Sequence, residues 1–245
     1  MRFWISRLIR TAQAVLIGVL LNACASVPGR TVNQDPWQGM NRAIYKFNDG
    51  VDHVALKPVA NAYRKVTPTW VRTGVTNFFS NLGTPWTMIN QGLQGKPNLM
   101  AKDGCRFVVN TVLGLGGFID VAERLNLESH NEDFGQTLAI WGVPSGPYVM
   151  LPLLGPSTLR DSFGKGPDYF GRPTQHIDIP WQTETAMTSL EVIQRRENLL
   201  SMDERLNQTY DPYIFVRDAW IQRREFQVYD GNPPITDLEE DSFSP

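Results

Sequence analysis

The sequence predicts a mainly α-helical protein built as a single domain. Asp-Pro and Thr-Pro pairs stand where helices commonly begin, and apolar residues follow them at spacings of three and four, the period of one helical face. Glycine and proline clusters separate these patterns, and no internal repeat divides the chain. A chain of 245 residues suffices for one domain with a core.

The first helix is expected to begin at Asp35-Pro36, where the carboxylate would cap the helix and the proline would take its first position. Pro58 is expected to end this helix, because a proline cannot donate a backbone hydrogen bond. Its apolar face would consist of Trp37, Met40, Ile44, Phe47, Val51 and Val54.

A second helix is expected after Thr67-Pro68, and the segment from Gly83 to Pro85 should break it. Its apolar residues include Trp70, Val71, Val75, Phe78, Phe79 and Leu82. A third helix is expected from about Pro97 to Leu113, where it runs into the glycine-rich residues 114–117.

A short helix is expected around Phe134 to Trp141. The segment that follows, Gly142 to Pro156, is apolar but rich in glycine and proline, which exclude a regular helix. Pro152 also argues against a central strand. We therefore expect an irregular apolar loop here.

The longest helical pattern extends from about Thr183 to Leu206, and Asp211-Pro212 opens a last helix. Residues 230–245 carry five acidic residues, three prolines and no basic residue, a composition typical of disorder. The helical domain would therefore comprise residues 35–229.

The N-terminus is expected to be a signal peptide. Three arginines precede a short apolar run, and Leu21-Asn22-Ala23-Cys24 follows that run. A cysteine directly after the expected cleavage site forms a lipobox, so residues 1–23 would be removed and Cys24 would carry acyl chains. An ordinary signal peptide with a chance cysteine and an uncleaved anchor are the alternatives, but a membrane span needs about 20 apolar residues.

Residues 24–34 would then form a lipidated tether. Ala25 stands where an aspartate would otherwise mark retention, which resembles the outer-membrane address of Gram-negative lipoproteins. Several acyl chains on one cysteine suffice for stable attachment, because each buried methylene contributes about 0.8 kcal/mol.

Charge and cysteine content exclude several classes of function. The chain has 23 Lys and Arg against 25 Asp and Glu, and the signal removes three of the arginines, so a charge-driven interaction with nucleic acid is not expected. Two cysteines, one of them lipidated, provide no disulfide framework. Cys105 is expected to be a small buried side chain.

Recognisable catalytic, nucleotide-binding and metal-binding motifs are missing. Ser145 stands one place too late for a nucleophile elbow, and Gly164-Lys165 lacks the remaining glycine of a phosphate-binding loop. His53, His130 and His176 have no ligand partners at metal spacing. We therefore assign no catalytic residue, metal or cofactor, although a triad assembled from distant residues stays open.

Three segments together resemble the MlaA family of lipoproteins, also called VacJ. They are DPWQGMNRAIYKFND from Asp35, FVVNTVLGLGGFIDVA from Phe107 and FGQTLAIWGVPSGPYVMLPLLGPSTLRD from Phe134, and DPYIFVRDAWIQRREF from Asp211 agrees with them. The resemblance spans nearly the whole mature chain and is thin only between Ser162 and Asn207.

This resemblance implies a ring of amphipathic helices that lies in the outer membrane around an amphipathic channel. Proteins of this kind are thought to take mislocalised phospholipid from the outer leaflet and pass it to a soluble periplasmic carrier, in association with a trimeric porin. Lipid asymmetry would be maintained without catalysis.

The resemblance also suggests site residues. It places a channel-side gating loop at Gly142, Val143, Pro144, Ser145, Gly146, Pro147 and Tyr148, with a rigid buried loop fixed by its prolines as the alternative. It relates Phe47-Asn48 to control of the channel opening, with helix packing as the alternative. Gly114, Gly116 and Gly117 would form a hinge, or else a helix C-cap and close packing point.

Aromatic residues leave a similar choice open. Trp37, Phe47, Trp70 and Phe78 would by default belong to a core, but aromatic rings with one polar edge also suit the head-group boundary of a membrane. Two other functions are alternatives to transport. A lipid hydrolase would need Ser145 or Ser157 near His130 or His176, and a structural envelope tether would need no site.

Overall fold

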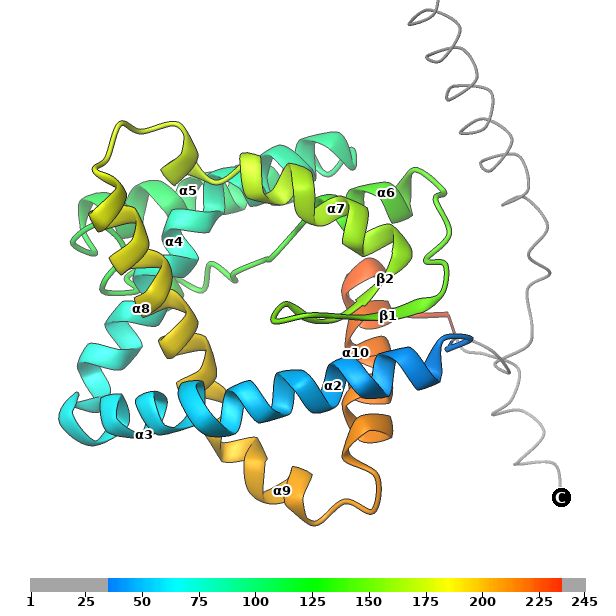
Figure 1. Ribbon diagram of the computed structural model, residues 1–245. Coiled ribbons are helices and arrows are strands. Elements are labelled where there is room, and N and C mark those ends of the chain that lie inside the picture. Colours follow the sequence, from blue (N-terminus) through cyan, green and yellow to red (C-terminus); the bar gives the residue numbers. More distant parts are fainter. Residues whose placement is uncertain (1–34, 235–245) are drawn as a thin grey trace, which may run out of the picture.

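Helices form the perimeter of the molecule, and a β-hairpin projects between them (Figure 1). The computed structural model describes residues 35–234, so the predicted signal, Cys24, the tether and most of the acidic tail lie outside the described residues. The helices and strands are α2 Gln38–Val51, a π-helix Asp52–Leu56, α3 Lys57–Val66, α4 Thr69–Leu93, α5 Pro97–Val112, α6 Phe134–Ile140, β1 Tyr148–Leu151, β2 Gly155–Thr158, α7 Leu159–Phe170, α8 Trp181–Leu199, α9 Asp203–Asn207 and α10 Pro212–Val228. Short 3-10 turns cover Glu123–Leu125, Pro173–Gln175 and Leu200–Met202.

The packing of these elements closes a ring. The α2 helix continues into α3, which packs on α8, and α8 packs on α4. The chain of contacts then passes from α4 through α6 to α7 and α10, from α10 to β2, and from β1 back to α2 (Figure 1). The predicted mainly α-helical ring is thereby confirmed for the described residues. Every helix in residues 35–234 falls short of the length or the apolar character that a membrane span requires.

The first helix begins and ends differently from the prediction. Its N-cap is Trp37, because Asp35 instead binds Asn41 and Tyr213. Pro58 does not end the helix. The π-helix ends at Leu56, two residues before the proline, the amide of Lys57 donates to the carbonyl of Asp52, and α3 continues through Pro58. The wider turn places the proline at a change of hydrogen-bond register, where its missing N–H costs least.

The expected break at Gly83 to Pro85 is also wrong, because α4 passes through Pro85 without interruption. The hydroxyl of Thr84 donates to the carbonyl of Ser80 one turn earlier. The indole of Trp86, directly after the proline, donates to Asp168 on α7 at 2.9 Å. A bond within the helix before Pro85 and a tertiary contact after it therefore stabilise the helix on both sides of a residue that disfavours it.

The segment Gly142 to Pro156 contains regular structure that was not predicted. Residues 148–151 pair in antiparallel register with residues 155–158, so that Tyr148 faces Thr158 and Leu151 faces Gly155. Pro152 lies in the turn and not in a strand, which agrees with its prediction. The α7 helix was missed entirely, and a 3-10 turn at residues 200–202 divides the long pattern predicted for residues 183–206.

The distribution of polar and apolar residues is inverted relative to a water-soluble domain. Among residues 35–234, only five hydrophobic residues are buried, whereas nineteen polar or charged residues are. On α5, for example, the buried residues are Asp103, Arg106 and Asn110. Cys105 lies outside this buried face and is exposed, so its predicted burial is wrong.

Candidate functional site

The β-hairpin is held to α2 by two asparagine side chains, which we call the hairpin latch. The amide of Asn41 donates to the carbonyl of Tyr148 at 3.1 Å, and its oxygen accepts from the backbone N–H of Met150 at 2.9 Å. These two groups belong to one edge of β1. The Asn41 side chain therefore replaces a neighbouring strand and satisfies backbone groups that would otherwise be buried without partners.

Asn48 repeats this arrangement at the tip of the hairpin. Its amide donates to the carbonyl of Leu151 at 3.0 Å, and its oxygen accepts from the N–H of Leu153 at 2.8 Å. Asn41 and Asn48 are seven residues apart, which is close to two helical turns, so both point from one face of α2. Leu153 has a left-handed backbone with φ +61°, an unfavourable conformation for leucine.

Beneath the latch, the described chain has its small hydrophobic cluster of Tyr148, Met150 and Tyr213. The carboxylate of Asp35 accepts hydrogen bonds from Asn41 at 2.8 Å and from the Tyr213 hydroxyl. Burial and the hydrogen bond to Asp35 raise the pKa of Tyr213 above its usual range. Burial also raises the pKa of Tyr148, whose hydroxyl has no hydrogen-bond partner among the described residues.

The tip of the hairpin points into the opening of the ring (Figure 1), and it exposes the apolar side chains of Leu153 and Leu154. Leu153 is 68% exposed, and Phe47, next to the latch residue Asn48, is 54% exposed. Trp37 and Trp70 are exposed as well, so three of the four aromatic residues that would by default be core residues are exposed. Phe78 is half-buried.

The seven residues of the predicted gating loop fall into two parts. Residues 142–146 are exposed, and Gly142 and Gly146 have φ values of +86° and +66°. The end of the loop is bound to the start of α7, because the carbonyl of Ser145 accepts from the N–H of Arg160 at 3.1 Å and that of Pro147 from Leu159 at 3.0 Å. Tyr148 lies in β1 with its ring in the hydrophobic cluster.

The glycines predicted as a hinge lie at the end of α5. A Cβ on Gly114 would overlap the carbonyl oxygen of Ile119, and one on Gly117 would overlap the side chain of Asn81. The N–H of Gly116 donates to the carbonyl of Thr111 at 3.0 Å, as at a helix end. This geometry fits the helix-end and close-packing interpretation, and the hinge stays a prediction.

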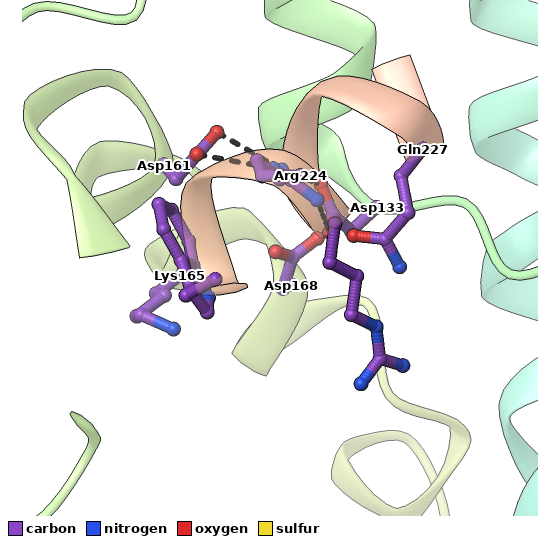
Figure 2. Close-up of a pocket in the computed structure, with 8 residues that line it drawn as sticks. Asp133, Asp161, Lys165, Asp168, Arg224 and Gln227 are labelled. Atoms are coloured by element: carbon purple, nitrogen blue, oxygen red, sulfur yellow. Dashed lines mark hydrogen bonds and ion pairs between the residues drawn. The ribbon is translucent and has the colours of Figure 1, made fainter. Parts of the chain in front are cut away.

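A second feature is a charged pocket of about 190 Å³ between α7 and α10, shown in Figure 2. Arg224 of α10 binds Asp133 through two hydrogen bonds of 2.7 Å and binds Asp161 at 2.9 and 3.0 Å. The pocket is lined by Asp133, Asp161, Lys165, Asp168, Trp220, Arg223, Arg224 and Gln227. The sequence analysis did not predict this network, because Asp161 and Asp133 lie 63 and 91 residues before Arg224.

Two carboxylates of the charged pocket differ in their electrostatics. Burial alone would raise the pKa of Asp161, but the hydrogen bonds and charge of Arg224 outweigh burial and hold that pKa below its ordinary value. Among residues 35–234, Asp168 receives hydrogen bonds only from neutral donors, the indole of Trp86 and the N–H of Phe134. Burial therefore raises the pKa of Asp168.

Among residues 35–234, no hydrogen bond connects a candidate hydrolase serine, Ser145 or Ser157, to His130 or His176. The ring of His130 binds Asp103 at 3.1 Å, and that of His176 binds the carbonyl of Phe170 at 2.7 Å. The hydroxyl of Ser157 accepts from Ser162 at 3.0 Å. His130 and Asp103 resemble the base and the orienting group of a triad. Asp103, however, also accepts a hydrogen bond from Gln91, which joins α5 to α4.

Comparison with known proteins relates this chain to one family. The profile of the MlaA lipoprotein family matches residues 33–227. The intermembrane phospholipid transport system lipoprotein MlaA of Escherichia coli K12 is 40% identical over 228 residues, which cover 91% of this chain and 90% of the relative. The protein of the same name from Haemophilus influenzae is 32% identical and covers 89% and 90%.

A solved structure agrees with the sequence relatives. It comes from work on the structural basis for maintenance of bacterial outer membrane lipid asymmetry, and it superimposes with a TM-score of 0.69 at 39% sequence identity. The match covers 81% of this chain and 99% of the solved chain.

Proposed function

This chain belongs to the MlaA lipoprotein family, and on that premise we propose how it moves phospholipid. It is a lipoprotein of the intermembrane phospholipid transport system that maintains outer-membrane lipid asymmetry. In our proposal it removes mislocalised phospholipid from the outer leaflet through an amphipathic channel inside the ring. It then passes the lipid to a periplasmic carrier.

The observation that carries this proposal is the inverted burial of the ring. Large apolar side chains such as Trp70, Phe163 and Trp181 are each more than two-thirds exposed, while polar side chains bind one another inside. Moving one such side chain from water into an apolar medium gains about 1.5–3 kcal/mol. A ring with many of them is stable in a medium of hydrocarbon chains, where its internal hydrogen bonds replace those to water.

Polar contacts between α4 and α5 support the same placement. Asn81 donates to the hydroxyl of Thr111 at 3.0 Å, and Gln91 binds the buried carboxylate of Asp103. The apolar residues of the same two helices, such as Ile89 and Val108, are exposed instead. Helices that pair through polar faces and expose apolar faces are expected of a protein surrounded by lipid.

In the proposed cycle, the hairpin and the loop at residues 142–147 gate the channel. The latch residue Asn48 sets the position of the hairpin tip, and Phe47 lies at the opening. Three acyl chains on Cys24 would hold the ring in the outer membrane with its exit toward the periplasm. A trimeric porin would associate with the ring, and a soluble lipid carrier would receive the phospholipid.

A cell-surface labelling experiment tests this function. Phosphatidylethanolamine on intact cells is labelled with an amine reagent that does not cross membranes, in a strain lacking the protein and in one that expresses it again. We expect the deletion to increase labelling and the intact protein to reverse it, whereas Cys24→Ala should not. Equal labelling in all strains would exclude the proposed function.

A crosslinking experiment tests the path through the ring. A photoreactive amino acid replaces Leu153 at the hairpin tip or Ser145 in the loop, and Glu225 on the exposed side of α10 serves as the control position. Phospholipid should be captured from the two test positions and much less from the control. Equal capture from all three positions would contradict a channel gated by the hairpin.

The same labelling assay, applied to further variants, distinguishes transport from the two alternatives. A hydrolase should lose its effect on surface phospholipid when His130 or His176 is replaced without loss of folding. A tether should tolerate replacement of residues 142–146. Our proposal expects the opposite result in both cases.

A further inference from the structure

We propose that the charged pocket between α7 and α10 binds the zwitterionic phosphoethanolamine head group of a phospholipid. In this arrangement Asp168 receives the ammonium, and Lys165 and Arg223 receive the phosphate. The inference rests on the proposed function, because it assigns a lipid class to the transported cargo. It uses residues that neither the latch nor the gating loop involves.

Half of the charged side chains that line the pocket are already compensated by ion pairs. Arg224 binds both Asp133 and Asp161, and Arg160 binds Asp161 at 3.1 Å. These two arginines and two aspartates carry no net charge together. They form a rigid wall, because the Arg224 guanidinium is fixed by four hydrogen bonds to carboxylate oxygens.

The remaining charges lack partners among residues 35–234. Asp168 forms no ion pair there, and its two hydrogen bonds reach a single oxygen, Oδ1. Lys165 and Arg223 form no ion pair in the same part of the chain, yet both line the same pocket. One uncompensated carboxylate and two uncompensated cations in one cavity match a ligand that carries an ammonium and a phosphate.

Selectivity follows from the free oxygen of Asp168. A primary ammonium has three N–H donors and can satisfy that oxygen with a charge-assisted hydrogen bond. A glycerol head group offers only hydroxyls, and a choline head group has methyl groups in place of the donors. We therefore expect ethanolamine lipids to bind more tightly than either of these.

The pocket is also connected to the hairpin. Trp220 lines the pocket, and its ring packs edge-to-face against Tyr148 of β1 with a centroid distance of 6.1 Å. A head group in the pocket therefore lies one side chain away from the cluster that supports the hairpin latch. This places the recognition of the head group next to the element proposed to gate the channel.

Calorimetric titration of the purified, lipidated protein in detergent tests the pocket. The probes are short-chain phosphatidylethanolamine, phosphatidylglycerol and phosphatidylcholine, together with free phosphoethanolamine. Asp168→Asn keeps an oxygen for Trp86 and Phe134 but removes the charge. We expect the wild-type protein to prefer the ethanolamine lipid by about tenfold, and Asp168→Asn to remove most of that preference.

Matched controls separate charge in the pocket from charge elsewhere. Asp178→Asn changes an exposed aspartate between α7 and α8, and Lys102→Gln changes an exposed lysine of α5. Neither should alter the preference, whereas Lys165→Gln with Arg223→Gln should weaken all phosphate-bearing lipids. A preference that survives Asp168→Asn would overturn the inference, as would a failure of the double variant to weaken binding.

Two further outcomes identify the source of the ligand. Free phosphoethanolamine that binds as tightly as the lipid would show a site for a soluble compound, which contradicts a lipid site. If the deletion strain exposes phospholipid while the variants show no change in preference, this inference fails and the proposed function stands. If the deletion strain exposes none, the proposed function itself fails.

Discussion

The side-chain oxygen of Asn48 accepts a hydrogen bond from the backbone N–H of Leu153, which lies 105 residues later and has a left-handed backbone. Residues held in such conformations cost of order 1–3 kcal/mol and persist only when their surroundings determine them. Here α2 stabilises the conformation of Leu153 through the side-chain amide of Asn48. The hairpin tip is therefore fixed by a contact that a small movement of α2 or of the hairpin would break.

Asn48→Ala should release the tip of the hairpin. The substitution removes two hydrogen bonds and leaves the carbonyl of Leu151 and the N–H of Leu153 without these partners. The expected local destabilisation is about 1–3 kcal/mol, seen as faster amide exchange at Leu153. Asn61→Ala removes a hydrogen bond to the carbonyl of Lys57 within α3, and it should leave this exchange unchanged. Equally slow exchange in Asn48→Ala would show that the amide does not hold the tip.

Leu153→Gly should stabilise the fold in spite of losing a side chain. Glycine adopts φ +61° without steric cost, and the leucine side chain is mostly exposed, so little burial is lost. The gain should be below about 1 kcal/mol, because glycine also increases the entropy of the unfolded chain. Leu154→Gly, at a neighbour without positive φ, should lower the melting temperature. The same decrease in both variants would mean that the Leu153 backbone is not strained.

Local signals in the sequence predict those elements that local chemistry determines. Asp211 caps α10 by accepting from the N–H of Ile214, and α5 and α6 begin where their patterns place them. Local rules fail where distant contacts oppose them. The helix through Pro85 is held by Trp86 and Asp168, which are 82 residues apart.

Periodicity also could not tell which face of a helix is buried. Apolar spacing marks one face of an amphipathic helix, and in water that face would turn inward. Here the polar faces are buried, so Asn41 and Asn110 belong to the interior while Phe47 and Val112 are exposed. A signal was present in the two asparagines at residues 41 and 48, which share one helical face. Their partners lie more than 100 residues away, beyond the reach of any local pattern.

Arg224→Met should strongly destabilise the protein. It leaves the Asp133 and Asp161 carboxylates without the guanidinium that binds both, at a site where Arg224 is buried. Breaking a buried ion pair by removing one partner costs about 3–5 kcal/mol. Chemical denaturation in detergent measures the effect, and Arg205→Met, which changes an exposed arginine of α9, should remain within about 0.5 kcal/mol of the wild type. Similar values for the two variants would assign the Arg224 network no role in stability.

Asp161 and Asp168 should affect the pH dependence of stability in opposite directions. The pKa of Asp161 is lowered in the folded state, so its contribution is present above the unfolded value of 3.8 and is lost as pH falls through the folded value. The pKa of Asp168 is raised by burial, so folding is favoured most at low pH and loses that contribution as pH rises through the folded value. Asp161→Asn should therefore flatten the loss of stability toward acid, whereas Asp168→Asn should flatten the loss toward neutral pH. Denaturation between about pH 3 and 7 measures both slopes. Parallel changes in the two variants would contradict the assigned directions, because the pKa of Asp161 is lowered by Arg224 whereas that of Asp168 is raised by burial.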